Sequence, residues 1–169
     1  MSFTIGDTVV HPQHGVGQVV KLEDREFEPG KMRQYYEISI PAGGTVWVPA
    51  DLHPSGLRSP AARSEIAQCR QILLSRPASF KDDVRTRQAN LAGRLKQGTI
   101  RTQCEIVRDL FAFGEHKSLY GSMAGFFRQT QNVLCQEWAL VEGVTFPEAL
   151  QEVTSLLEKS RASMRKAKA

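Results

Sequence analysis

Two histidines near the N-terminus have a spacing that could bind a metal, because His11 and His14 form an H-x-x-H pair. Zinc needs three or four converging nitrogen, sulfur or carboxylate ligands. Before residue 69 the only further histidine or cysteine is His53. Gly15 and Gly17 follow the pair and lead into a β-branched run rather than a helix, which is not the pattern of a phosphate-binding loop. We therefore expect these residues to form a turn between two strands, with no metal and no cofactor.

The three cysteines, Cys69, Cys104 and Cys135, are odd in number, widely spaced and flanked by apolar residues in segments with helical periodicity. This pattern is typical of buried, reduced thiols. No Ser-His-Asp or Cys-His arrangement with supporting context, no paired-carboxylate motif and no metal-ligand set accompanies them. We therefore expect that the protein is not an enzyme.

A basic run without a carboxylate lies between residues 84 and 104. It contains Arg85, Arg87, Arg94, Lys96 and Arg101. A guanidinium can hold a phosphate through two hydrogen bonds, so this run favours phosphate contact over a merely solvated face. No base-reading motif accompanies it, and we expect contact with a nucleic-acid backbone or minor groove at low sequence specificity.

Charge is distributed unevenly along the 169 residues. Residues 1–59 carry 5 Lys and Arg against 7 Asp and Glu, whereas residues 60–169 carry 17 against 11. This asymmetry suggests that the C-terminal part meets a polyanion, although random charge placement on a solvated surface is the open alternative. The sequence has no 18-residue apolar stretch and no basic segment followed by an apolar run at its start, so we expect a cytoplasmic protein.

β-Branched and aromatic runs predict four short strands within the first 50 or so residues. Two lie within residues 6–20, and the others cover residues 34–40 and 45–49. The charged segment 23–30 ends in Pro29-Gly30 and is interpreted as an exposed hairpin tip. Together these strands predict a small SH3/Tudor-like antiparallel β-barrel over residues 1–58.

Trp47 alternates with two valines along the fourth strand, so its side chain lies on the face opposite Val46 and Val48. Two alternatives stay open. If the core takes the valines, Trp47 is an exposed indole of the kind that anchors interfaces; if the core takes Trp47, it is a packing residue.

From Ser59 onward the apolar period changes from 2 to 3.6, and five helices are predicted. Ser59-Pro60 is expected to open the first, Ser79 to cap a second from residue 80 to about 97, and Thr145 with Glu148 to form a capping box for the fifth. The overall prediction is an α+β chain, with a compact five-helix domain over residues 59–160 and a basic flexible tail over 161–169.

The N-terminal motif resembles a known family. Gly6-Asp-x-Val-Val-His-Pro-x-His-Gly-Val-Gly17, then Tyr36, Val46-Trp-Val-Pro49 and Gly56-Leu-Arg58 are similar to the RNA-polymerase-interacting domain of CarD/CdnL bacterial transcription regulators, which transcription-repair coupling factors share. Weaker similarities at 107–110 and 137–140 extend the resemblance to about residue 160. The resemblance implies that Arg25, Trp47, Val48 and Pro49 contact the polymerase β subunit.

The sequence also departs from this family. Members that stabilise an open promoter carry a wedge tryptophan near the start of the second helix, where this chain has Asp83-Val84 with Phe80 as the nearest aromatic residue. Met123-Ala-Gly125 stands where the family has a basic cluster. The resemblance therefore implies polymerase binding more directly than promoter opening.

Two function classes follow. The first is a transcription regulator whose barrel binds the polymerase β subunit and whose basic helical domain contacts promoter DNA, with no small-molecule substrate and no membrane partner. The second is an SH3/Tudor-like interaction module that uses Tyr35, Tyr36 and Trp47 as an aromatic patch for a peptide or a modified lysine.

Overall fold

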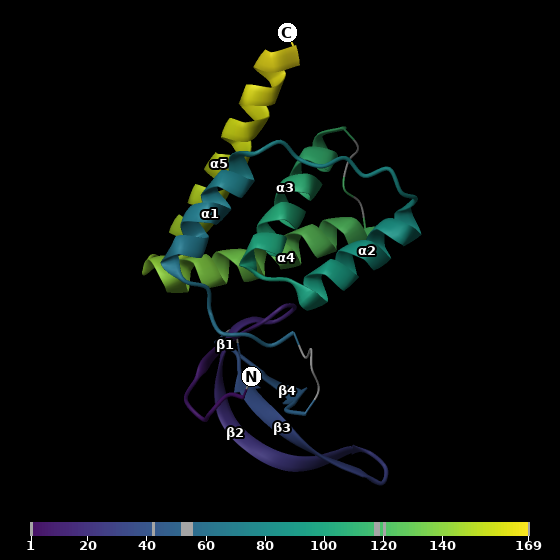
Figure 1. Ribbon diagram of the computed structural model, residues 1–169, viewed down its shortest axis with the longest axis vertical. Helices are drawn as coiled ribbons and strands as arrows, with labels where there is room; N and C mark the ends of the chain where they lie inside the picture. The colour runs from purple at the N-terminus through teal and green to yellow at the C-terminus, as the bar shows by residue number, and fades with distance from the viewer. Residues whose placement is uncertain (1, 42, 52–55, 117–118, 120, 169) are drawn as a thin grey trace. The chain divides into compact units, whose positions relative to one another are not determined.

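The computed structural model describes residues 2–41, 43–51, 56–116, 119 and 121–168. The chain divides into two compact units at residues 60 and 61. The first unit contains four strands and the second contains five helices, which confirms the predicted α+β class with a small N-terminal β domain (Figure 1).

The N-terminal unit is an antiparallel meander in the order β1-β2-β3-β4. Its strands are β1 (Thr8–His11), β2 (Gly15–Glu28), β3 (Lys31–Ser39) and β4 (Thr45–Pro49). After β4 the chain returns to β1, where Val10 and Arg58 exchange two backbone hydrogen bonds of 2.8 and 3.1 Å. This return pairing covers part of the edge of β1 that would otherwise be unpaired.

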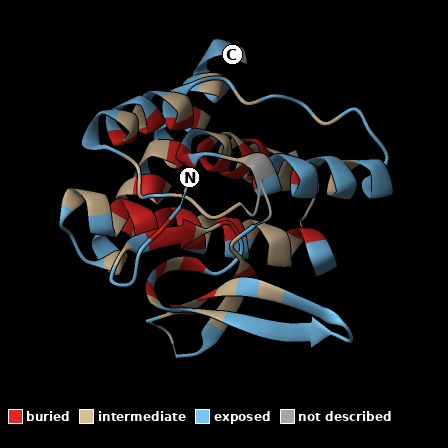
Figure 2. Cartoon of the chain, turned by 60° about the horizontal axis from the view of Figure 1, so that its bottom comes forward, coloured by how far each residue is buried: buried red, intermediate tan, exposed pale blue. Residues whose placement is uncertain are grey.

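The core of this unit lies on one face of the sheet, as the two-residue period requires. Figure 2 colours the buried residues of both units red. Its fully or nearly buried residues are Phe3, Val9, Val19, Tyr36, Ile38 and Val48. The Tyr36 hydroxyl accepts a hydrogen bond from the backbone N–H of Phe3 at 3.0 Å. The chain before β1 is thereby fixed to the middle of β3.

Gly17 is required by close packing in β2. A Cβ atom at this position would lie 2.6 Å from the Cγ2 of Ile38 and 2.9 Å from the carbonyl oxygen of Ser39. One of these neighbours is backbone, which cannot move aside as a flexible side chain can. Close packing against β3 therefore requires a glycine at the second position of the Gly15-Val-Gly17 motif.

The turn between β1 and β2 is organised by His11. Its Nδ1 accepts the backbone N–H groups of Gln13 at 3.2 Å and His14 at 3.3 Å, and its ring lies 4.6 Å from the His14 ring. Burial, and secondly the charge of His14, lowers the pKa of His11 to about 4. The imidazole thus stays neutral and serves as the acceptor of the turn. His53, the third member of the metal set considered from the sequence, lies outside the described residues.

The C-terminal unit contains α1 (Arg63–Leu74), α2 (Val84–Gln97), α3 (Ile100–His116), α4 (Gly121–Glu142) and α5 (Phe146–Lys168). Its main core packs α1, α3, α4 and α5 around Trp138 and the three buried cysteines. A second core packs α2 on α3 and α4 through Leu91, Leu95, Ile106, Leu110 and Met123. Burial holds the pKa of Cys104 well above its ordinary value and raises that of Cys135 to about 12, so both stay as thiols.

Two predicted helix starts are wrong, and in both cases the hydrogen bonds of the residues just before the helix decide the boundary. α1 begins at Arg63 rather than behind Ser59, because the buried Glu137 of α4 accepts the N–H of Ala61 at 2.8 Å and Glu65 accepts that of Ala62 at 2.9 Å. α2 begins at Val84 rather than Phe80. Its cap is Asp83, whose side chain accepts the N–H of Thr86 at 3.0 Å.

The fifth helix, α5, begins as predicted but extends further than predicted. Glu148 accepts both the N–H and the hydroxyl of Thr145 at 2.8 Å, as the capping box predicted. However, α5 continues to Lys168, so residues 161–168 are helical; their mobility stays a prediction. Among the described residues no helix is long and apolar enough to cross a membrane.

We expect Gly17→Ala to lower the free energy of unfolding of the N-terminal unit by about 1–3 kcal/mol, the usual effect of overpacking. The measurement is the thermal or denaturant transition reported by the Trp47 indole N–H resonance. Thr8→Ala on the neighbouring strand, where the side chain is exposed, is the control. An unchanged transition for Gly17→Ala would show that β2 and β3 can separate without cost.

The lowered pKa of His11 predicts that the N-terminal unit loses stability as the pH falls from 6.5 to about 4. In this window the unfolded chain binds a proton that the folded chain does not, so the free energy of unfolding rises with pH. After allowance for partial solvation, the total effect is about 1–2 kcal/mol.

His11→Asn tests this origin, since an amide oxygen can still accept the two turn hydrogen bonds but does not titrate. The variant should give a flatter dependence of the same NMR transition on pH. A pH profile as steep as that of the parent would assign the effect to another group.

Candidate interaction surfaces

An aromatic cluster lies on the outer face of the sheet. The Phe27 ring lies 4.8 Å from Tyr35 and 6.0 Å from Trp47, measured between ring centroids. The Arg25 guanidinium lies over the Trp47 ring at 4.5 Å. We call Arg25, Phe27, Tyr35 and Trp47 the outer-face cluster. Because Phe27 is 55% exposed, the cluster presents apolar area to solvent.

The side on which Trp47 lies is decided by the two valines. Val48 is 4% exposed in the core, and Val46 packs against the same core. Trp47 therefore lies on the outer face, half-buried beneath Arg25 and Phe27. Of the residues that the resemblance assigns to polymerase contact, Val48 has its side chain in the core, whereas Pro49 pairs with Tyr35 on the outer side.

Arg25 is held in place by a neighbouring carboxylate. Its Nε and one terminal nitrogen donate to the same oxygen of Glu23 at 2.9 and 2.6 Å. The side chain is still 47% exposed. An exposed cation fixed over an indole can form a further ion pair with a partner without much reordering.

The alternative aromatic patch of Tyr35, Tyr36 and Trp47 does not form. Tyr36 is 5% exposed and belongs to the core, since it alternates with Tyr35 along β3. Phe27, which takes the third place, was not predicted. It lies in the segment interpreted as a hairpin tip, where β2 instead continues to Glu28 with a register irregularity between Glu26 and Glu28. In the sequence, Phe27 stands out as the one aromatic residue within a run of charged residues.

Two arginines of the basic run at residues 84–104 are engaged in contacts that the sequence does not indicate. Arg94 forms an ion pair with Glu105 of α3 at 3.0 Å. Arg87 lies over Phe80 and Phe113, at 5.4 and 4.6 Å from the ring centroids, and donates to the carbonyl oxygen of Asp82 at 2.6 Å. The run is therefore not free of carboxylates in space, since Glu105 opposes Arg94, and Arg87 is engaged by two rings and a backbone carbonyl oxygen.

Three cations of the run remain available. Arg85, Lys96 and Arg101 are exposed, and none forms an ion pair with another described residue. They lie at the start of α2, in its last turn and at the start of α3. Within the parts of the chain that the structure describes, no three His, Cys, Asp or Glu side chains gather as metal ligands would. The candidate surfaces are thus the outer-face cluster of the sheet and the three exposed cations of α2 and α3.

Comparison with known proteins agrees with the resemblance drawn from the motif. Residues 3–58 match the family model of the CarD-like/TRCF RID domain. Over 147 residues the chain is 28% identical to the Bacillus subtilis (strain 168) protein named "Putative transcription factor YdeB", a match that covers 85% of this chain and 94% of that protein. Residues 3–58 are therefore similar to the CarD-like/TRCF RID domain, in agreement with the resemblance drawn from the motif.

Proposed function

We propose that this protein is a non-enzymatic transcription regulator that binds the β subunit of bacterial RNA polymerase through the outer-face cluster and promoter DNA through the helical unit. The domain model that matches residues 3–58 and the name of the relative support a transcription-related role with RNA polymerase as a partner. The β subunit, the DNA contact and the residues that make them are our proposal.

The observation that carries the polymerase contact is the outward-facing Trp47 under Arg25. An aromatic side chain surrounded by partly exposed neighbours is typical of a hot spot in a protein interface. The ring is half-buried before binding, so its position is set in advance and little side-chain entropy is lost on association. Pro49 extends the same side of the sheet next to Tyr35.

The DNA contact is supported by the cations that the fold leaves available on α2 and α3, namely Arg85, Lys96 and Arg101. Arg87 and Arg94 belong to the same basic run but are already engaged. No aromatic wedge stands at the start of α2, where Asp83 is the helix cap. The proposed contact is thus to phosphates, with little dependence on sequence and little preference for melted duplex.

Two contacts carried on one chain strengthen each other. Once the N-terminal unit has bound polymerase, the helical unit is held near the promoter DNA and its weak affinity acts at a raised effective concentration. This explains how a modest number of available cations can suffice in the proposed complex.

We expect Trp47→Ala to weaken binding to RNA polymerase by about 2 kcal/mol or more while leaving the fold intact. The measurement is equilibrium binding of the full chain to purified polymerase, together with a thermal melt. Thr45→Ala, an exposed change two residues earlier on the same face of β4, is the matched control. A large fall in melting temperature with unchanged binding would show that Trp47 acts only in packing.

For the DNA contact we expect Arg85→Ala with Arg101→Ala to flatten the log–log dependence of duplex affinity on salt by about 1.8, since each phosphate contact contributes about 0.9. The measurement is titration of a short duplex between about 50 and 200 mM salt.

Arg87→Ala with Arg94→Ala removes the same charge from side chains that are already engaged, so it is the control and should change the slope less. A larger change in this control would assign the contact to the engaged pair and contradict the proposal.

A further inference from the structure

Arginines from three segments distant in sequence gather toward one end of the helical unit. Arg76 follows α1, Arg108 is on α3, and Arg161 and Arg165 are on α5. We call these four residues the arginine corner. Arg108 and Arg161 line one small hollow with Pro77 and Met164, which places the segment after α1 beside both helices.

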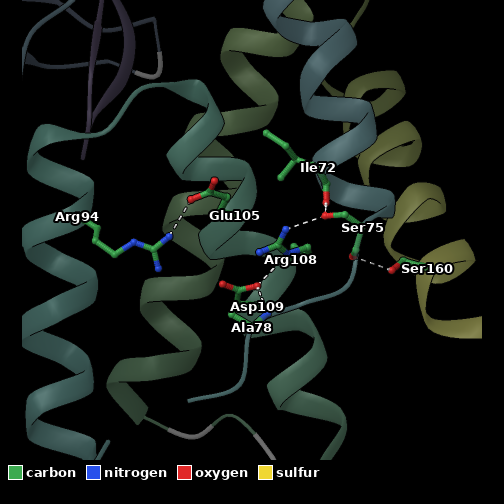
Figure 3. A network of polar contacts seen from close by, with 8 residues as sticks. All are labelled: Ile72, Ser75, Ala78, Arg94, Glu105, Arg108, Asp109 and Ser160. Atoms are coloured by element: carbon green, nitrogen blue, oxygen red, sulfur yellow. Dashed lines mark hydrogen bonds and ion pairs between the residues drawn. The ribbon is translucent and has the colours of Figure 1, made fainter. Parts of the chain in front are cut away.

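A polar network fixes this arrangement (Figure 3). The Arg108 guanidinium donates to the carboxylate of Asp109 at 2.8 Å and to the Ser75 hydroxyl at 2.8 Å. Asp109, 2% exposed, also accepts the N–H of Ala78 at 3.0 Å. The hydroxyl of Ser160 donates to the carbonyl oxygen of Ser75 at 3.4 Å. The segment that carries Arg76 is thus bonded to α3 on one side and to α5 on the other.

Arg161 is also held in a defined position. It forms an ion pair with Glu158 one turn earlier and lies over the Phe111 ring at 5.8 Å from the centroid. Arg165 follows one turn later, on the same side of α5, and is exposed. Arg76 is exposed as well, and Arg108 keeps 14% of its side chain accessible. Contacts with neighbouring segments thus hold Arg108 and Arg161 in place, and Arg76 and Arg165 are the exposed members of the corner.

The charge at this end of the unit is strongly positive. From Lys159 to the C-terminus the chain has five Lys or Arg residues and no acid. Arg76 and Arg108 add to this charge. Among the described carboxylates, Asp109 is buried and bonded twice, and Glu158 is paired with Arg161. The last turns of α5 would be stabilised by one or two cations near the helix C-terminus, but more cations are present than that role needs.

We propose that the arginine corner is a second surface for the phosphates of duplex DNA, separate from the cations of α2. This rests on the proposed function, because it adds a contact to the same DNA-binding unit. Guanidinium groups match phosphate oxygens in geometry and charge, and those of Arg76 and Arg165 are on exposed residues. α3 packs against both α2 and the α1–α5 pair, so the two basic surfaces lie on different flanks of one helix packing (Figure 1).

The surface fits other partners less well. A protein interface of useful affinity has exposed aromatic or apolar anchors, and here Phe111 and Met164 are half-buried beside the cations. A membrane-surface helix needs an apolar face turned to lipid, whereas the apolar stripe Ala149, Val153 and Leu157 of α5 is buried in the core. Among macromolecular ligands, a phosphate polymer is what this surface recognises.

The test uses the full chain with Arg76→Ala and Arg165→Ala together, both exposed positions, in the duplex titration between about 50 and 200 mM salt. The slope should flatten by about 1.8, or about 0.9 for each phosphate that the variant no longer neutralises. Lysine at both positions should keep most of the slope, because it also neutralises a phosphate. Arg85→Ala with Arg101→Ala is the charge-matched variant on the other surface.

The outcomes separate the two proposals. A flatter slope in the corner variant supports the corner, whether or not the α2 variant also changes. If the corner variant keeps the salt dependence of the unaltered chain while the α2 variant shows a flatter one, the inference about the arginine corner is overturned and the proposed function is unaffected. If the unaltered chain fails to bind duplex at low salt, both DNA contacts fall. If the corner variant binds DNA normally but binds polymerase less tightly, its partner is an acidic protein surface and the inference is overturned.

Discussion

Two buried carboxylates hold the segment before α1 and the connection from α1 to α2, and the packing of the helices around these segments depends on them. Glu137 of α4 accepts the N–H of Ala61 just before α1, and Asp109 of α3 accepts the N–H of Ala78 in the connection to α2. Burying a carboxylate is unfavourable unless donors satisfy it, so each backbone N–H also has a stabilising role for its partner. The same Asp109 orients Arg108, which links the helix packing to the basic surface beside it.

A second ionic group ties the helices together near the tryptophan core. Arg70 of α1 donates to Glu152 of α5 at 2.6 Å and to Glu142 of α4 at 2.9 Å, and it lies over the Trp138 ring at 5.2 Å. Trp138 donates its indole N–H to Glu152 at 3.0 Å. The bond to Arg70 lowers the pKa of Glu152, and the bonds to Glu152 and then Glu142 raise the pKa of Arg70. Both charged forms are therefore favoured, and the relative positions of α1, α4 and α5 are fixed.

In the N-terminal unit, the alternation of side chains along the strands decides which residues face the core and which face outward. With Val9, Val19, Ile38 and Val48 in the core, the residues between them must face outward. Aromatic residues on that outward face are poorly covered by a four-stranded sheet, so they cover one another: Phe27 and Arg25 shield Trp47 only in part. In this way, the packing of the small core leaves a preformed aromatic surface available to a partner.

The sequence by itself determined the α+β class, the presence of four strands, the capping box at Thr145, the burial of the cysteines and the similarity of residues 3–58 to a known domain, because these depend on local period, local hydrogen bonds and a contiguous motif. Contacts between distant segments decided most of the rest. The start of α1 depends on Glu137 of another helix, and the pairing of Arg94 depends on Glu105 of α3. Phe27 joins Trp47, and Pro77 lies beside Arg161, only because strands and helices far apart in the chain pack together. A linear pattern records which charges and rings are present, but their freedom to bind is set by their neighbours in space.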